Sequence, residues 1–307
     1  MSDAVPIVVR LQRYDDDPFG PVPAAGPPRL WTLAAMLPIA LMAATMLSSA
    51  TLAVLFLPAA RQLRAMALGP RRLAESLMGQ PAGYFGAGLG TCVALAGCAL
   101  VAAALSPTAP SLRERLRLHE PPRWLATGLA GAAALVGVSR LGNSLREALG
   151  AFGEGPVGVA RHDFAGMSPE LTVLGVLIVG AGAGIGEELF FRGYLQTRLE
   201  QRAPPWLANV AVAALFGLAH GELWHSTFAF GAGLVLGWTA RRAGTILAST
   251  VAHALNNGFW VVMMALGRAD RDAWHHDGGV ASFVAGALLV GVGLAGVWSL
   301  TRASRAG

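Results

Sequence analysis

Residues 171–202 read LTVLGVLIVGAGAGIGEELFFRGYLQTRLEQR. About sixteen residues run without a charge, and Glu187, Glu188 and Arg192 then follow in quick succession. A run of this kind is long enough to lie in a bilayer. An ionised side chain at the centre of a membrane helix costs about 2.5–3.5 kcal/mol, so charges there indicate a functional site with partners on other helices.

The composition is that of a membrane protein. Of the 307 residues, 54% are hydrophobic and only 13% are charged, against about 25% in soluble proteins. This predicts an all-α, polytopic transmembrane helix bundle in a lipid bilayer. The arginines are scattered between apolar segments and form no stripe, which argues against a nucleic-acid partner. Cys92 and Cys98 share one apolar run and are expected to be buried thiols.

Eight apolar segments predict about eight spans. They lie at about residues 30–58, 84–105, 124–138 and 171–202, from near 206, 226 and 245, and at about 280–300. The chain then divides into four regions. A polar, poorly ordered tail (residues 1–29) is followed by N-terminal membrane helices (30–165). A core that carries the intramembrane charges (166–268) comes next, and then a final helix with a short tail (269–307).

The arginine distribution predicts which side the ends face. An even number of spans puts both ends on one side, and cytoplasmic connections are rich in Arg. With both termini in the cytoplasm, 14 of the 23 arginines fall inside and the 221–225 connection has none. The cluster between Arg61 and Arg72 is the exception. We therefore expect an integral protein of the bacterial inner membrane with both termini cytoplasmic.

Two further helices bring polar residues to the depth of Glu187. Counted from the polar end of each helix at about 1.5 Å per residue, the four residues lie about 16–22 Å along their helices. They are Glu187, His220, His253 and Asn257. Independent placement would not be expected to give one common level, so the coincidence favours a shared site.

Helical geometry also indicates which neighbours face each other. Residues four apart share a helix face, which pairs Glu188 with Arg192, Phe216 with His220, and His253 with Asn257. Glu187 is rotated by about 100° from Glu188. We therefore expect Glu188 and Arg192 to neutralise each other as a supporting pair, and Glu187 to face another helix.

An unpaired carboxylate opposite two imidazoles and an amide is a hydrolytic arrangement. Glu187 can act as general base on a water, and Asn257 can donate to the oxyanion of a tetrahedral intermediate. His220 and His253 can hold that water or, with Glu187, bind a divalent metal such as zinc. Each polar residue alone is equally compatible with helix packing. Their joint occurrence at one depth favours catalysis.

The segment HGELWH, from His220 to His225, is weaker evidence for a metal site. Glu222 follows His220 by two residues, so the helical H-E-x-x-H register is absent. We expect Glu222 and His225 to lie at the rim of the site.

Three pieces of the chain, EELFFR (187–192), FGLAH (216–220) and HALNN (253–257), resemble motifs of the CPBP intramembrane proteases. That family includes the type II CAAX prenyl endopeptidases and abortive-infection and bacteriocin-immunity relatives. The resemblance covers about residues 170–265. It implies that Glu187 activates the water with His220 as its partner, and that His253 and Asn257 orient the water or stabilise the oxyanion. It leaves open whether a metal or the glutamate alone activates the water.

The sequence thus predicts an intramembrane endopeptidase whose partners are a membrane-associated protein or lipidated peptide and the bilayer. The site is expected to open to the cytoplasmic half of the bilayer. One alternative is a non-proteolytic scaffold or bacteriocin self-immunity protein of the same family. A proton-coupled transporter is a further alternative, but the sequence shows neither inverted repeats nor paired broken helices.

Overall fold

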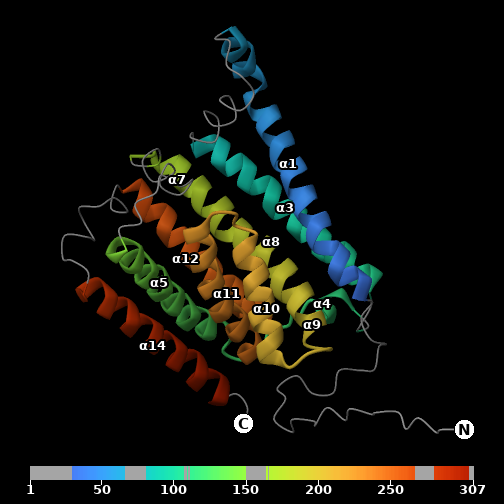
Figure 1. The fold of residues 1–307 in the computed structure, drawn as a ribbon, viewed down its shortest axis with the longest axis vertical. Helices are drawn as coiled ribbons and strands as arrows, with labels where there is room; N and C mark the ends of the chain where they lie inside the picture. Colours follow the sequence, from blue (N-terminus) through green and yellow to red (C-terminus); the bar gives the residue numbers. More distant parts are fainter. Residues whose placement is uncertain are drawn as a thin grey trace, which may run out of the picture.

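The computed structural model describes residues 30–65, 81–106, 111–149, 166–266 and 280–303, with Ala109 and Phe164. The predicted tail at residues 1–29 and the last residues of the chain lie outside this part. Within it the chain is helical and contains no strand (Figure 1). The elements are α1 (Leu30–Ala65), α3 (Pro81–Leu105), α4 (Leu112–Arg115), α5 (Trp124–Ala148), α7 (Pro169–Gly175), η1 (Val176–Gly182), α8 (Ala183–Glu188), η2 (Leu189–Gln196), α9 (Thr197–Leu199), α10 (Pro205–Leu218), α11 (Leu223–Ala243), α12 (Ile246–Ala265) and α14 (Val280–Ala303).

The all-α, polytopic fold class is confirmed, and the count of about eight spans stays a prediction. Each of the eight predicted segments forms a helix, yet six helices of the described part are long and apolar enough to cross a membrane. The two others, α10 and α11, form a hairpin. At 14 residues, α10 is only about 21 Å long, short of a ~30 Å hydrocarbon core. Two arginines in its last turn make α11 less apolar.

The helical column from α7 to α9 forms the centre of the bundle. It packs against α3, α12, α10 and α11, while α1 covers α3 and α14 covers α5 at the periphery (Figure 1). Large apolar side chains stay exposed on the two peripheral helices, for example Met46 on α1 and Val292 on α14. Such surfaces suit contact with lipid.

Small residues let the central column approach its neighbours closely. A Cβ added to Gly184 would lie 3.0–3.2 Å from atoms of Ala254 on α12, and one on Gly186 would lie 2.5 Å from the Cys92 carbonyl oxygen on α3. Both distances are too short for a side chain, so the glycines fix the helix separation. Small residues thus serve close packing between membrane helices here.

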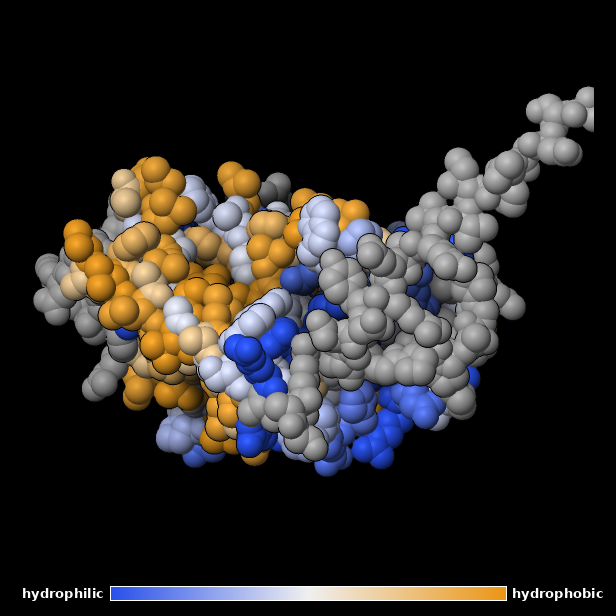
Figure 2. Space-filling view, turned by 90° about the horizontal axis from the view of Figure 1, so that it is seen from below, coloured by the Kyte–Doolittle hydropathy of each residue, from blue (hydrophilic) through white to orange (hydrophobic). Residues whose placement is uncertain are grey.

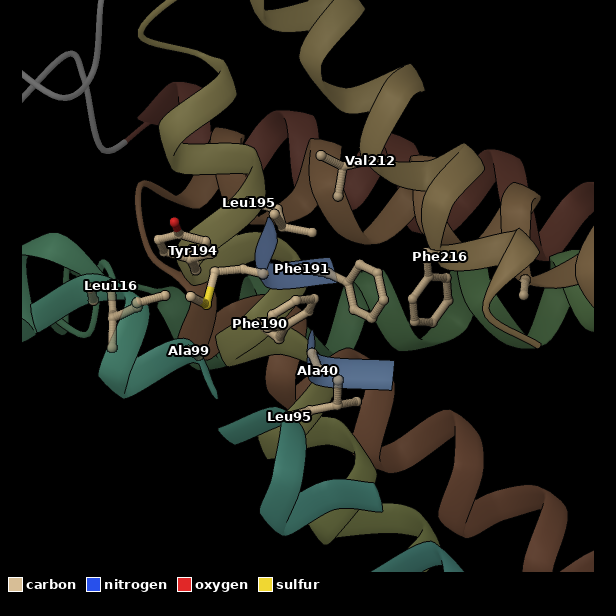
Figure 3. Packing of buried hydrophobic residues seen from close by; sticks show 14 residues of the cluster. Ala40, Leu95, Ala99, Leu116, Phe190, Phe191, Tyr194, Leu195, Val212 and Phe216 are labelled. Carbon is tan, nitrogen blue, oxygen red and sulfur yellow. The ribbon is translucent and has the colours of Figure 1, made fainter. Parts of the chain in front are cut away.

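A cluster of buried apolar side chains surrounds η2 and supports the intramembrane charges (Figure 3). Its members are contributed by α1, α3, η2, α10, α11 and the segment after α4. Those labelled in the close-up are Ala40, Leu95, Ala99, Leu116, Phe190, Phe191, Tyr194, Leu195, Val212 and Phe216. The rings of Phe191 and Phe216 meet edge to face, with centroids 5.1 Å apart.

One end of the bundle is rich in arginine. There Glu200 lies 2.7 Å from the Arg117 guanidinium and 3.7 Å from that of Arg241, and Arg242 donates to Thr301 near the end of α14. Helix α1 begins and α14 ends at this same end (Figure 1). Seen from below, hydrophilic residues gather across it beside apolar ones (Figure 2).

Candidate active site

Glu187 and Glu188 lie in α8, a short α-helical stretch between two π-helical segments, η1 and η2. In η1, the N–H of Ala183 donates to the Ile178 carbonyl five residues back. In η2, the Thr197 hydroxyl donates to the Arg192 carbonyl at 2.9 Å. A π-turn acts as a one-residue insertion into an α-helix and is frequent at functional sites. The sequence carries no recognised signal for these turns.

Glu188 and Arg192 form the predicted ion pair. Arg192 Nη1 donates to Glu188 Oε1 at 2.7 Å, and both side chains are at most 1% exposed. The guanidinium also donates to the Gly233 carbonyl at 3.3 Å and lies 4.4 Å from the centre of the Phe216 ring. Arg192 therefore connects the central column to α11 and α10 as well as neutralising a carboxylate.

His253 lies between the two carboxylates, an arrangement that the helix-face argument missed. Its Nδ1 is 3.0 Å from Glu188 Oε1, and its Nε2 is 3.8 Å from Glu187 Oε2. The two imidazole nitrogens lie on different edges of the ring, so one side chain can approach both carboxylates. Glu188 thus supports the site through His253 as well as through Arg192.

Glu187 differs from Glu188 in exposure. Its side chain is 17% exposed, whereas that of Glu188 is fully buried. Its Oε2 atom is buried and makes no hydrogen bond within the described part of the chain. Glu188 Oε2 is likewise buried without a hydrogen bond in this part of the chain, so exposure and the ion pair with Arg192 are what distinguish the two carboxylates.

His220 lies at the end of α10, next to Phe216. Its Nδ1 is 2.7 Å from the Phe216 carbonyl oxygen, and the two ring centroids are 4.9 Å apart. The Phe216 ring is also 5.9 Å from that of His253. Phe216 therefore lies between the two histidines, and no hydrogen bond or ion pair joins His220 to Glu187 among the residues that the structure describes.

Glu222 and His225, which we expected at the rim of the site, lie at the start of α11, next to the turn that follows α10. Glu222 caps α11 by accepting from the backbone N–H groups of Trp224 and His225. The His225 ring is 4.5 Å from that of His220, centroid to centroid. His225 is thus the nearest additional imidazole to the motif residues, and its place in HGELWH was the only sequence signal for it.

Asn257 uses its amide to contact the helix that carries the carboxylates. Its Nδ2 donates to the Val179 carbonyl in η1 at 3.2 Å, and its Oδ1 accepts from Asn256 Nδ2 at 3.2 Å. The structure therefore brings Asn257 to the central column through the backbone. Its predicted role as oxyanion donor would use its second N–H.

The predicted metal ligands do not converge in this arrangement. No group of three His, Cys, Asp or Glu residues across the described ranges could hold a metal ion. The Nδ1 atoms of His220 and His253 are engaged with the Phe216 carbonyl and with Glu188, an arrangement that is also usual for histidines that bind a metal through Nε2, so the conclusion rests on the distance between the three side chains. These residues as arranged do not fit a three-ligand metal site, and the zinc site stays a prediction.

Comparison with known proteins gives one match. No curated protein and no solved structure matches the chain. Residues 169–259 match the model of the family described as type II CAAX prenyl endopeptidase Rce1-like. The matched segment contains all three motifs. The match confirms, for this segment, the resemblance to the CPBP/CAAX protease family that the motifs predicted.

Proposed function

We propose that the protein is an intramembrane endopeptidase that hydrolyses a peptide bond in a membrane-associated protein. One observation carries the proposal. Glu187 Oε2 and His253 Nε2 face each other at 3.8 Å inside the bundle, and Glu188 holds the opposite edge of the imidazole.

This geometry supports the activation of a water. His253 donates its Nδ1–H to Glu188, which leaves Nε2 of the neutral ring as an acceptor. Glu187 Oε2 is also an acceptor, so two acceptors face each other without a proton between them. A water within reach of both supplies the two O–H donors that they require.

Hydrolysis then follows from the position of that water. Glu187 takes one proton as the water oxygen attacks the carbonyl carbon of the substrate. The C=O bond opens to an oxyanion, towards which Asn257 and His220 would donate hydrogen bonds. Glu187 returns the proton to the leaving nitrogen as the C–N bond breaks, giving a carboxylic acid and an amine.

A membrane proteome comparison tests the activity without a known substrate. Strains that carry the wild type, Glu187→Gln, or the control Ser299→Ala are compared by mass spectrometry of protein termini. The Ser299 hydroxyl bonds only the Ala295 carbonyl of its own helix. We expect at least one processed terminus to disappear in the Glu187→Gln strain alone, while the variant accumulates normally in the membrane. Unchanged processing would refute the proposal.

The orientation belongs to the same proposal. The arginine-rich end supports its placement in the cytoplasm of a bacterium, with both termini on that side. A reporter that is active only in the cytoplasm, fused after residue 307, should then be active. The site would open to the cytoplasmic half of the bilayer.

A non-proteolytic scaffold or immunity protein is the second candidate. The observation in its favour is that Glu188, Arg192 and Asn257 all make interhelical bonds that stabilise packing. If Glu187 were also structural, its Ala variant would lose membrane accumulation and function together. A folded but inactive Glu187→Ala variant supports the protease.

A further inference from the structure

In η1, the Val179 carbonyl accepts a hydrogen bond from a side chain on another helix, that of Asn257. In a regular α-helix, the N–H of Ala183 would donate to the Val179 carbonyl four residues back. Here it donates instead to the carbonyls of Ile178 and Gly180. Asn257 Nδ2 reaches across from α12 and donates to Val179 O at 3.2 Å. The Asn257 amide therefore donates to the carbonyl that would accept from the Ala183 N–H in a regular α-helix.

This contact bears on the direction of the carboxylates. A π-turn adds one residue to the helix, and one residue corresponds to a rotation of about 100°. If η1 relaxed to regular α-helix, the following turn would rotate by about that angle relative to Val179. Glu187 and Glu188 would then no longer face His253. The π-turn is thus a requirement for the geometry of the site.

Two residues behind Asn257 hold its amide in place. Asn256 Nδ2 donates to Asn257 Oδ1 at 3.2 Å, and the Ser139 hydroxyl donates to Asn256 Oδ1 at 3.4 Å. Asn256 is only 9% exposed, so its amide has few alternatives to these partners. Ser139 lies on α5, outside the segment that matches the protease family.

We infer that Ser139 and Asn256 are positioning residues that act in series. They orient the Asn257 amide onto the Val179 carbonyl, and this bond holds the π-turn that directs Glu187 towards His253. The structural part of this inference stands on the hydrogen bonds alone. Its consequence for catalysis rests on the proposed function.

A series arrangement differs measurably from three independent packing contacts. In a series, Ser139 acts only through Asn256, so removing Ser139 after Asn256 has been removed changes nothing more. Independent contacts would instead give effects that multiply. A double-mutant cycle separates these cases.

The chain contains its own reporter for the place of α8. Cys92 is 7% exposed and packs against this column, with its Sγ 4.0 Å from the Ile178 carbonyl oxygen and its own carbonyl against Gly186. Rotation of α8 would open this contact. In a Cys98→Ser background, Cys92 is the only thiol, and its rate of alkylation by N-ethylmaleimide reports the rotation.

The experiment uses the full chain in lipid nanodiscs. The variants are Ser139→Ala, Asn256→Ala and their combination, with Ser139→Thr as the hydroxyl-preserving rescue and Ser299→Ala as control. Cys92 alkylation is measured for each, and kcat and KM are measured with an internally quenched peptide that carries an S-farnesyl cysteine. That probe is chosen from the class of the matched family.

We expect each single Ala variant to lower kcat about 5- to 10-fold, as for the loss of about one hydrogen bond, with KM unchanged. Cys92 alkylation should accelerate in the same variants, the combination should match Asn256→Ala, and Ser139→Thr should match the wild type. Multiplying effects, or alkylation rates equal to those of the wild type, would overturn the inference. If the wild type does not cleave the peptide, the proposed function is weakened. The alkylation rates of the single and double variants then decide alone whether Ser139 acts through Asn256.

Discussion

Exchanging the two adjacent glutamates for glutamine, one at a time, should give opposite results. Glu188 is fully buried and bonded to Arg192 at 2.7 Å and to His253 at 3.0 Å. Glu188→Gln removes the charge but leaves the buried guanidinium. Breaking a buried pair by removing one partner costs about 3–5 kcal/mol, because the other charge stays uncompensated.

Glu187→Gln should cost little stability. Glu187 is partly exposed, and within the described residues its ion-pair partner is His253, with Nε2 at 3.8 Å from Oε2. A weak, partly solvated pair contributes about 0–1 kcal/mol. Loss of the general base should nevertheless lower kcat by about 10²–10⁴-fold.

Thermal unfolding in detergent separates the two variants. At about 2–4 °C per kcal/mol for a chain of roughly this size, Glu188→Gln should lower the melting temperature by about 6–20 °C, and Glu187→Gln by less than about 4 °C. The double variant Glu188→Gln, Arg192→Met is the matched control. Because it removes both charges, it should be more stable than Glu188→Gln alone. Equal destabilisation by the two single variants, or no recovery in the double variant, would refute the assignment of roles.

Three further predictions concern other parts of the molecule. Gly237→Ala would place a Cβ against the side-chain oxygens of Asn209 and Gln196, and we expect a loss of about 1–3 kcal/mol in thermal unfolding from overpacking; an unchanged melting temperature would show that α10 can move. Glu200→Gln leaves the Arg117 guanidinium, 14% exposed, with a weaker partner, and should cost about 1–3 kcal/mol, less than Glu188→Gln, because Arg117 can reach water; a larger loss would contradict this. If zinc activates the water, 1,10-phenanthroline should stop cleavage and added zinc should restore it, and cleavage that persists would contradict the zinc prediction.

Sequence reasoning succeeded where the rule is local. The eight helical segments follow from runs of apolar residues, and the Glu188–Arg192 pair follows from their spacing of four along one helix. The helix rise alone predicted one depth for Glu187, His220, His253 and Asn257, and Glu187 and His253 indeed lie 3.8 Å apart.

It failed where two helices decide the geometry together. With a regular rotation of about 100° per residue, we expected Glu188 to pair with Arg192 on its own helix and only Glu187 to face a neighbouring helix. The π-turns before and after α8 break that regular rotation, and they depend on tertiary partners such as the Asn257 amide. Likewise, the shortness of α10 depends on the turn at Gly221, whose φ of +70° ends the helix before it could span.

The formal charges around His253 explain why one carboxylate is suited to chemistry and the other is not. Arg192 already compensates Glu188 at 2.7 Å, so the formal excess charge of the two carboxylates and the guanidinium is that of Glu187. When Glu187 takes a proton from a water beside it, this negative charge would pass to the attacking oxygen, and the net charge of the carboxylates, the guanidinium and the water would stay the same. The step would therefore create no additional charge inside the membrane, which favours Glu187 as the general base.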